Sequence, residues 1–154
     1  AANASGLEFA QSFDIGVSRM FQLFDCQDPF SPADVAKIEA YLQQKCGSFF
    51  NQAIPSVLIG ASGSFETFYE LLAQEIFDPN GTSVEVDIVE FKKMLDRIIA
   101  STQAERDGNA HIIPIRKRMA PLAAIKTRWV IQQAKIQQIY ISPYSLKEGV
   151  LFGL

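Results

Sequence analysis

The 154-residue sequence contains one histidine, His111, and two cysteines, Cys26 and Cys46. A zinc site built on several histidines is therefore excluded, and a Ser/His/Asp triad would have to use His111. Because two isoleucines follow His111, we expect it in a loop or in a partly buried position instead. Two cysteines cannot form a disulfide framework, and their spacing fits no metal motif. A reducing compartment, the cytoplasm, is the simplest expectation.

Long apolar runs are also missing. No run approaches the roughly 20 residues that span a bilayer, and no charged segment leads into a short apolar one. We therefore expect a soluble protein that does not use a membrane. With 48% hydrophobic and 20% charged residues, the composition excludes a disordered tail or a collagen-like fibre. The length suggests one domain, or two small ones, and no repeat or long linker divides the chain.

Charge is unevenly distributed along the chain, although the net charge is only −3. Residues 1–110 hold 16 acidic and 7 basic side chains, whereas residues 111–154 hold 7 basic side chains and Glu148 alone. This asymmetry indicates an anionic partner for the last third of the chain. A pI near 5.1 argues against DNA, so a phosphate-bearing metabolite fits better. The alternative is that Arg116, Lys117 and Lys135 only solvate helix ends.

Hydrophobic spacing and capping residues predict strands interleaved with helices, which indicates an α/β domain. An alternating strand should run from Leu7 to Phe13 after a turn at Ser5-Gly6. A short strand at residues 56–59 has the continuous apolar character of a buried parallel strand. A third strand is expected at residues 138–142. Two of the expected helices occupy residues 16–24 and 119–134. The others are expected to begin after Ser31, Ser64, Asp87, Thr102 and Ser145, and the one after Ser64 has Ile76 on its inner face.

The first loop that could carry chemistry is Gly60-Ala61-Ser62-Gly63-Ser64, between the second strand and a helix. A helix start leaves backbone N–H groups free to bind an anion, and glycines let the backbone approach a phosphate closely. Ser62 and Ser64 add hydroxyl donors. The loop is neither a Walker A loop nor a G-x-G-x-x-G motif. The alternative is that its glycines serve tight strand–helix packing alone.

Two further regions are candidates. The segment Ser142–Gly149 also follows a strand and opens a helix, so it should lie at the same edge of the sheet, where ligands of open α/β sheets bind. In it, Tyr144 and Lys147 are the ligand-facing candidates, whereas Glu148 is expected to cap the helix with Ser145. The third region is the basic run at residues 116–118, because a guanidinium grips phosphate through two hydrogen bonds. Arg106 is a similar candidate that could instead pair with Asp107.

Taken in order, four stretches of the sequence resemble the Ppx/GppA phosphatases, the exopolyphosphatase and guanosine pentaphosphate phosphohydrolase enzymes. Residues 12–20, Ser-Phe-Asp-Ile-Gly-Val-Ser-Arg-Met, are similar to the segment after that family's second glycine-rich loop. Residues 59–64 resemble its G-T-S/A-G-T/S loop. Glu105-Arg106 and the later Arg118 stand where the family has E-R and R-A/M. The closing stretch, residues 142–151, resembles the S-x-Y/G-x-L-R/K-E-G-V/L-L signature and is the most specific part.

The resemblance implies an actin-like, RNase H-type fold with a mixed sheet flanked by helices. It also implies that residues 1–154 are the C-terminal half of a two-domain core. The catalytic glutamate, two glycine-rich loops and most ligands of a divalent metal, Mg²⁺, would then belong to an N-terminal domain outside this chain, with no catalytic or metal-binding residue within it. The implied phosphate- and substrate-binding residues are Gly60, Ala61, Ser62, Gly63, Ser64, Arg106, Arg118, Tyr144 and Lys147. Two departures stand out: Ala61 replaces the usual Thr, and residues 108–115 differ from the family's usual turn.

The leading hypothesis is therefore hydrolysis of terminal phosphate from polyphosphate or guanosine pentaphosphate, a substrate that links such enzymes to the stringent response. A second hypothesis is a non-catalytic module of the same fold that senses nucleotide or polyphosphate. A third, half of an actin-like ATPase or sugar kinase, is disfavoured by the closing signature. Beyond the N-terminal domain as partner, a homodimer paired through the sheet edge at residues 1–5 is left open.

Overall fold

The computed structural model describes residues 2–3, 6–7, 9–51, 55–61 and 63–152. The strands are β1 (Ala2–Asn3), β2 (Gly6–Leu7), β3 (Val57–Ala61), β4 (Val84–Val86) and β5 (Gln138–Ser142). The helices are α1 (Val17–Leu23), α2 (Pro32–Cys46), α3 (Gly63–Ala73), α4 (Ile88–Ala100), α5 (Gln103–Gly108), α6 (Pro114–Lys117), α7 (Ala120–Gln133) and α8 (Leu146–Phe152), with a 3₁₀ helix, η1, at Gly47–Asn51.

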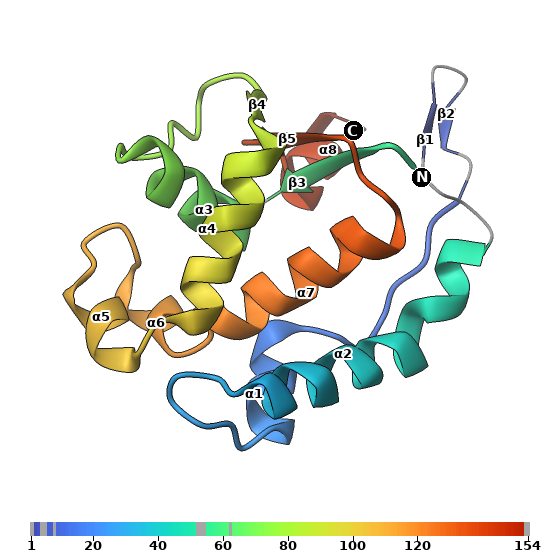
Figure 1. Ribbon diagram of the computed structural model, residues 1–154. Helices are drawn as coiled ribbons and strands as arrows, with labels where there is room; N and C mark the ends of the chain where they lie inside the picture. The colour runs from blue at the N-terminus through green and yellow to red at the C-terminus, as the bar shows by residue number, and fades with distance from the viewer. Residues whose placement is uncertain (1, 4–5, 8, 52–54, 62, 153–154) are drawn as a thin grey trace.

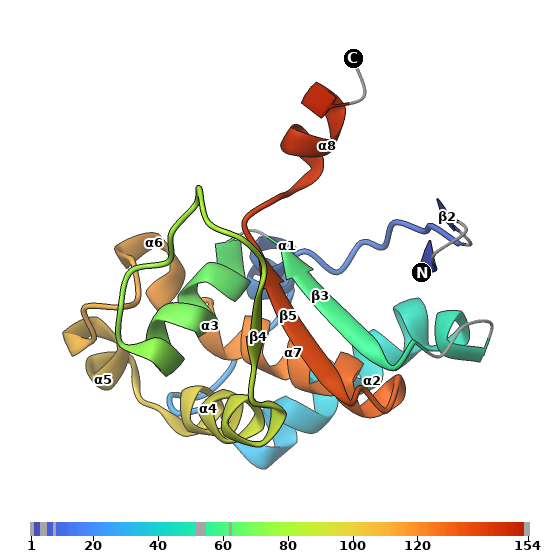
Figure 2. The ribbon, with the colours of Figure 1, turned by 90° about the horizontal axis from the view of Figure 1, so that it is seen from above.

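The main sheet is mixed, with the strand order β3-β5-β4. β3 and β5 are parallel, and β4 pairs with β5 in the antiparallel direction. Figure 2 shows the strands in front of α2, α4 and α7, and Figure 1 shows α7 between α2 and α4. The predicted α/β domain with a mixed sheet flanked by helices is confirmed.

The core lies between the sheet and α7. Ile139 and Ile141 of β5 are completely buried, as are Leu95 of α4 and Ile125 of α7. Most residues of α7 are buried because α1, α2 and α4 all pack against it. A helix enclosed by three others needs apolar residues on several faces.

Local helix signals are confirmed. Ser31 and Asp34 form a capping box at the start of α2, Thr102 and Glu105 form another at α5, and the Asp87 carboxylate accepts two backbone N–H groups at the start of α4. Each cap pairs N–H groups that a helix cannot satisfy by itself, so sequence alone places these boundaries.

Two expectations, about the first strand and about the end of α3, are wrong. The strand from Leu7 to Phe13 stops at Leu7, and residues 9–16 run without regular structure while the Phe9 and Phe13 rings pack on Phe49. β1 and β2 pair in the antiparallel direction on either side of the expected turn, of which Ser5 lies outside the described residues. Helix α3 ends at Ala73, which leaves Ile76 85% exposed instead of on an inner face.

The strand at residues 56–59 is not buried on both faces as expected. Ile59 is 66% exposed and pairs with Tyr140, which in turn pairs with Glu85, so these three residues form a row across the sheet. The Tyr140 hydroxyl donates to Glu85 Oε2 over 2.9 Å. This face of the described sheet is exposed because α4 and α7 pack on the other face, where Ile139 and Ile141 point.

Candidate anion-binding site

The two candidate loops begin at the same edge of the sheet, as predicted. Parallel β3 and β5 are in register from Val57 and Gln138 to Ala61 and Ser142, so both strands end together. α3 follows β3 almost at once, beginning at Gly63. The sequence therefore brings a helix start and a second loop to the carboxyl edge, where open α/β sheets bind ligands.

Gly60 is required by packing. Its backbone is buried, and a Cβ built on it would overlap the Phe65 ring. Phe65 in turn packs edge-on against Phe68 and is stacked with Phe91. Gly60 thus lets the first turn of α3 lie directly against β3, which supports the tight-packing alternative at this position.

Gly63 is the residue of the loop that faces a charged side chain. It has φ +27° and forms the first residue of α3. A Cβ added to Gly63 would lie 3.6 Å from Nη2 of Arg116. Gly63 and Ser64 line a cavity of about 180 Å³ together with Thr67 and Arg116. Its remaining walls are Val17, Ser18, Phe68, Met119, Ala120 and Ala123.

Arg116 is the cation of this cavity. Its Nη1 donates to Thr67 Oγ1 over 2.9 Å, and its Nη2 lies 3.4 Å from Glu66 Oε2. Both charged side chains are about one-third exposed, which leaves the guanidinium accessible from the cavity. Helix α3, at 11 residues, contributes the positive end of its dipole at the same point. Most walls of this small cavity are apolar, and the Arg116 cation and the start of α3 are the features of it that suit a phosphate group.

The three arginine and lysine residues expected at this site, Arg106, Arg118 and Lys147, all lie elsewhere. Arg118 is exposed and rests on the Phe21 ring, 5.0 Å from its centroid, in a separate cavity of about 330 Å³ beyond α1. Lys147 is 80% exposed on α8 and pairs with Glu148. Ser62 is outside the described residues. Ala61 is exposed at the end of β3.

Arg106 is buried rather than open to a ligand. Every nitrogen of its guanidinium has a partner within the protein, among them Asp28, Ser101 and the Lys117 carbonyl. The expected alternative partner, Asp107, instead accepts hydrogen bonds from Gln103 through its carboxylate and from Lys117 through its carbonyl. The structure thus does not bring Arg106 to the Gly63 cavity.

The second loop is shaped by its own hydrogen bonds. The Ser142 hydroxyl accepts from the Tyr144 N–H over 3.1 Å, and half-exposed Tyr144 turns the chain toward α8. Glu148 Oε2 accepts from both the Ser145 hydroxyl and the Ser145 N–H over 2.7 Å. These hydrogen bonds lower the pKa of Glu148 to about 2, so the predicted capping role is confirmed. α8 projects away from the rest of the molecule (Figure 2).

Metal ligands are not grouped in the described part of the chain. No three His, Cys, Asp or Glu side chains there are placed to hold one ion. His111 is partly buried in a turn, as expected, with its backbone N–H bonded to Asn109. Both cysteines are free, and burial raises the pKa of Cys46. None of the helices in these ranges is long and apolar enough to cross a membrane.

Arg116 is the functional candidate that sequence reasoning did not single out. It belongs to the recognised basic run, but the resemblance pointed to Arg118. Pro114 was a usable signal for a short helix that contains Arg116, because proline favours the first position of a helix and here starts α6. Thr67 and Ser18 carried no sequence signal, because only the fold brings them to the cavity.

Comparison with known proteins shows to which family this chain belongs. The sequence profile of the Ppx/GppA phosphatase family matches residues 3–154. This chain belongs to that family. No curated protein sequence matches it significantly.

Solved structures of the Ppx/GppA family share the fold. An exopolyphosphatase from Cytophaga hutchinsonii superposes with a TM-score of 0.85 at 32% identity, over 92% of this chain and 48% of that one. The Aquifex aeolicus member gives 0.75 at 18% identity, over 90% and 45%, and an exopolyphosphatase-like protein gives 0.79 at 20%, over 91% and 48%. The expected actin-like fold is confirmed, and the chain spans about half the length of these relatives.

Proposed function

We propose that this chain is the C-terminal half of a phosphohydrolase that releases terminal phosphate from inorganic polyphosphate, from guanosine pentaphosphate, or from both. The observation that carries this proposal is the meeting of Arg116 and the start of α3 at one cavity, in a Ppx/GppA chain. An N-terminal domain would close the other side of the phosphate cleft. The enzyme would act in the cytoplasm.

The chain's own contribution would be to bind and orient the substrate. Backbone N–H groups at the start of α3 and the Arg116 guanidinium would hold non-bridging phosphate oxygens and stabilise their charge. Water would attack the terminal phosphorus in line, and the phosphoanhydride P–O bond would break. The products would be orthophosphate and the substrate shortened by one phosphate. A base would take the proton of the attacking water. Glu66 is paired with Arg116 and Glu148 with Ser145, so we assign this base to the N-terminal domain.

The divalent metal suggested by the resemblance does not fit the residues described. Mg²⁺ binds clustered carboxylate and other oxygen ligands, and the described residues group no three carboxylates. We therefore route no step of the reaction through a metal held by this chain, and propose that Mg²⁺ would be bound mainly by the N-terminal domain.

The test compares this chain with a longer protein that carries an N-terminal Ppx/GppA domain. Phosphate release with Mg²⁺ is measured on long-chain polyphosphate and on guanosine pentaphosphate separately. We expect release by the longer protein and none by the 154-residue chain. Arg116→Ala should reduce release by about tenfold or more, in line with losing one charge-assisted contact.

Arg97→Ala is the matched control, since it removes the same charge from the last turn of α4, beside a different cavity that Leu71 and Gln74 also line. Equal losses in the two variants would contradict a specific role for Arg116. Phosphate release by the 154-residue chain alone would refute the assignment of the general base to the N-terminal domain. If neither protein releases phosphate but both bind tripolyphosphate, the non-catalytic sensing module is favoured.

A further inference from the structure

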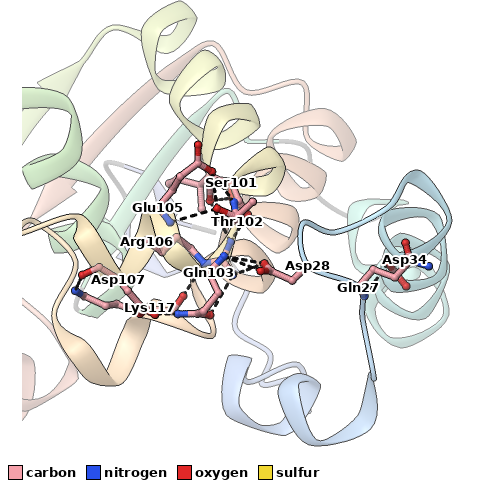
Figure 3. Close-up of polar contacts among 11 residues, drawn as sticks. Gln27, Asp28, Asp34, Ser101, Thr102, Gln103, Glu105, Arg106, Asp107 and Lys117 are labelled. Atoms are coloured by element: carbon pink, nitrogen blue, oxygen red, sulfur yellow. Dashed lines mark hydrogen bonds and ion pairs between the residues drawn. The ribbon is translucent and has the colours of Figure 1, made fainter.

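Arg106 is the most enclosed charged residue of the described structure, with only 3% of its surface exposed. Its Nη1 donates to the carbonyl and hydroxyl oxygens of Ser101, and its Nη2 to Asp28 and Gln103 over 3.1 Å each. Its Nε donates to the Lys117 carbonyl over 2.9 Å. Figure 3 shows the guanidinium at the centre of these contacts. A buried cation is tolerated only when it is this fully paired.

These partners come from three segments that are distant in sequence. Asp28 lies in the loop before α2, Ser101 and Gln103 lie at the turn from α4 into α5, and Lys117 is the last residue of α6. The Asp28 carboxylate also accepts from the Gln103 N–H, at 2.8 and 2.9 Å. Arg106 is therefore bonded to the loop before α2 and to the turn from α4 into α5, and its Nε bonds the end of α6.

Helix α6 has little to fix its own position. It has four residues, and no side chain caps its start at Ile113. So short a helix is not stable by itself. Its tertiary hydrogen bonds at the C-terminal end are the Arg106 Nε bond to the Lys117 carbonyl and the Lys117 Nζ bond to the Asp107 carbonyl. The residue just before Lys117 is Arg116, whose guanidinium reaches Thr67 and Glu66 across the Gly63 cavity.

We infer that Arg106 is a positioning residue for anion binding: by holding the Lys117 carbonyl it fixes α6 and so places Arg116 at the start of α3. This inference rests on the proposed phosphate-binding role of that cavity. A planar guanidinium is needed because only its fork of donors bonds three segments at once. A lysine at this position would keep the positive charge but could not donate hydrogen bonds to all three segments at once.

The test is a double-mutant cycle between Arg106→Lys and Arg116→Ala in the 154-residue chain, with inorganic tripolyphosphate as the probe and calorimetric titration as the readout. In the native background, Arg106→Lys should weaken binding by about five- to tenfold, which lies within the couplings found between residues of one network. In the Arg116→Ala background it should have no further effect. Arg128→Lys is the control, because Arg128 links α2 and α4 to α7 through Glu39 and Asp96 without touching α6.

Equal weakening in both backgrounds, or no weakening in the native one, would overturn the inference. If the native chain does not bind tripolyphosphate, the proposed phosphate role of the cavity fails, and positioning is then decided without ligand. The readout is the guanidinium NMR signal of Arg116 in chains whose thermal unfolding stays cooperative. A shift of that signal in Arg106→Lys, absent in Arg128→Lys, supports positioning, and an unmoved signal refutes it. If Arg106→Lys does not fold, Asp28→Asn loosens the same guanidinium and is judged by the same signal.

Discussion

The ion pair between Glu66 and Arg116 should oppose the proposed anion binding. The carboxylate occupies one edge of the guanidinium at 3.4 Å and adds negative charge beside the cavity. Glu66→Gln should therefore tighten tripolyphosphate binding by about two- to fivefold, since partly exposed ion pairs are worth about 0.2–1 kcal/mol. Calorimetric titration measures the change.

Glu70→Gln provides the control for the Glu66 substitution. It removes the same charge from the next turn of α3, where Glu70 accepts the Phe77 N–H and does not contact Arg116. If both variants tighten binding equally, the effect is one of overall charge, and the local competition described for Glu66 is wrong.

Gly60 has no room for a side chain. Gly60→Ala would drive the new methyl group into the Phe65 ring, which packs between Phe68 and Phe91. Overpacking of this kind costs about 1–3 kcal/mol, so the free energy of unfolding in urea should fall by that amount. Gly149→Ala is the control, because nothing lies within 4 Å of the added Cβ. An unchanged free energy for Gly60→Ala would mean that β3 and α3 separate easily.

The start of α8 should depend on pH through Glu148. Hydrogen bonds from the Ser145 hydroxyl and N–H hold the pKa of Glu148 at about 2, below its usual 4.5. A carboxyl whose pKa is lowered by folding stabilises the folded form above its unfolded pKa and loses that effect as the pH falls through the folded value. We expect α8 to loosen progressively between about pH 4.5 and about pH 2.

The measurement is an NMR titration of the Glu148 carboxyl carbon, with amide exchange along α8 followed in parallel. Ser145→Ala removes the hydroxyl donor and should move the titration midpoint upward toward 4.5. Glu148→Gln should make the exchange rates in α8 independent of pH in this range. A midpoint near 4.5 in the native chain would contradict the capping geometry.

Helix starts could be read from the sequence because their causes are local. Ser31, Asp87 and Thr102 each bond to N–H groups two or three residues away, so a short window of sequence contains the whole interaction. Strand burial could not be read in this way. Ile59 has the sequence context of a core residue, and only the placement of α4 and α7 on the opposite face leaves it exposed.

The site divides along the same line. Glycines 60 and 63 were recognisable because a strand ends and a helix begins around them. Which arginine lies beside Gly63 depends on how α6 is oriented, and we infer that Arg106 and Asp107 of α5 fix this orientation through their hydrogen bonds with Lys117 at the end of α6. The choice between Arg116 and Arg118 was therefore not available from spacing alone.

A net charge of −3 means that a polyanion approaches a molecule of its own sign. Binding must then depend on the local field of Arg116 and its basic neighbours rather than on the whole protein. Raising the ionic strength from about 0.1 M to about 1 M shortens the Debye length from about 10 Å to about 3 Å. We expect tripolyphosphate affinity to fall at least tenfold over this range.

Parallel unfolding experiments at both salt concentrations serve as the control, because a folded chain with weaker binding isolates the electrostatic effect. Affinity that is insensitive to salt would show that binding does not rely on the charge of Arg116.

The sequence's single tryptophan, Trp129, gives the molecule a built-in optical reporter. Its indole is 3% exposed within α7 and lies edge-on to Phe50 of η1, with ring centroids 5.4 Å apart. Six residues of helix, about 9 Å, separate it from Ala123, the residue of α7 at the cavity wall that is nearest to it in sequence. Its fluorescence emission should therefore not change when a ligand occupies the cavity, and it should change when η1 separates from α7. Fluorescence can then rank the folding of every variant proposed above without a label and without interference from the ligand.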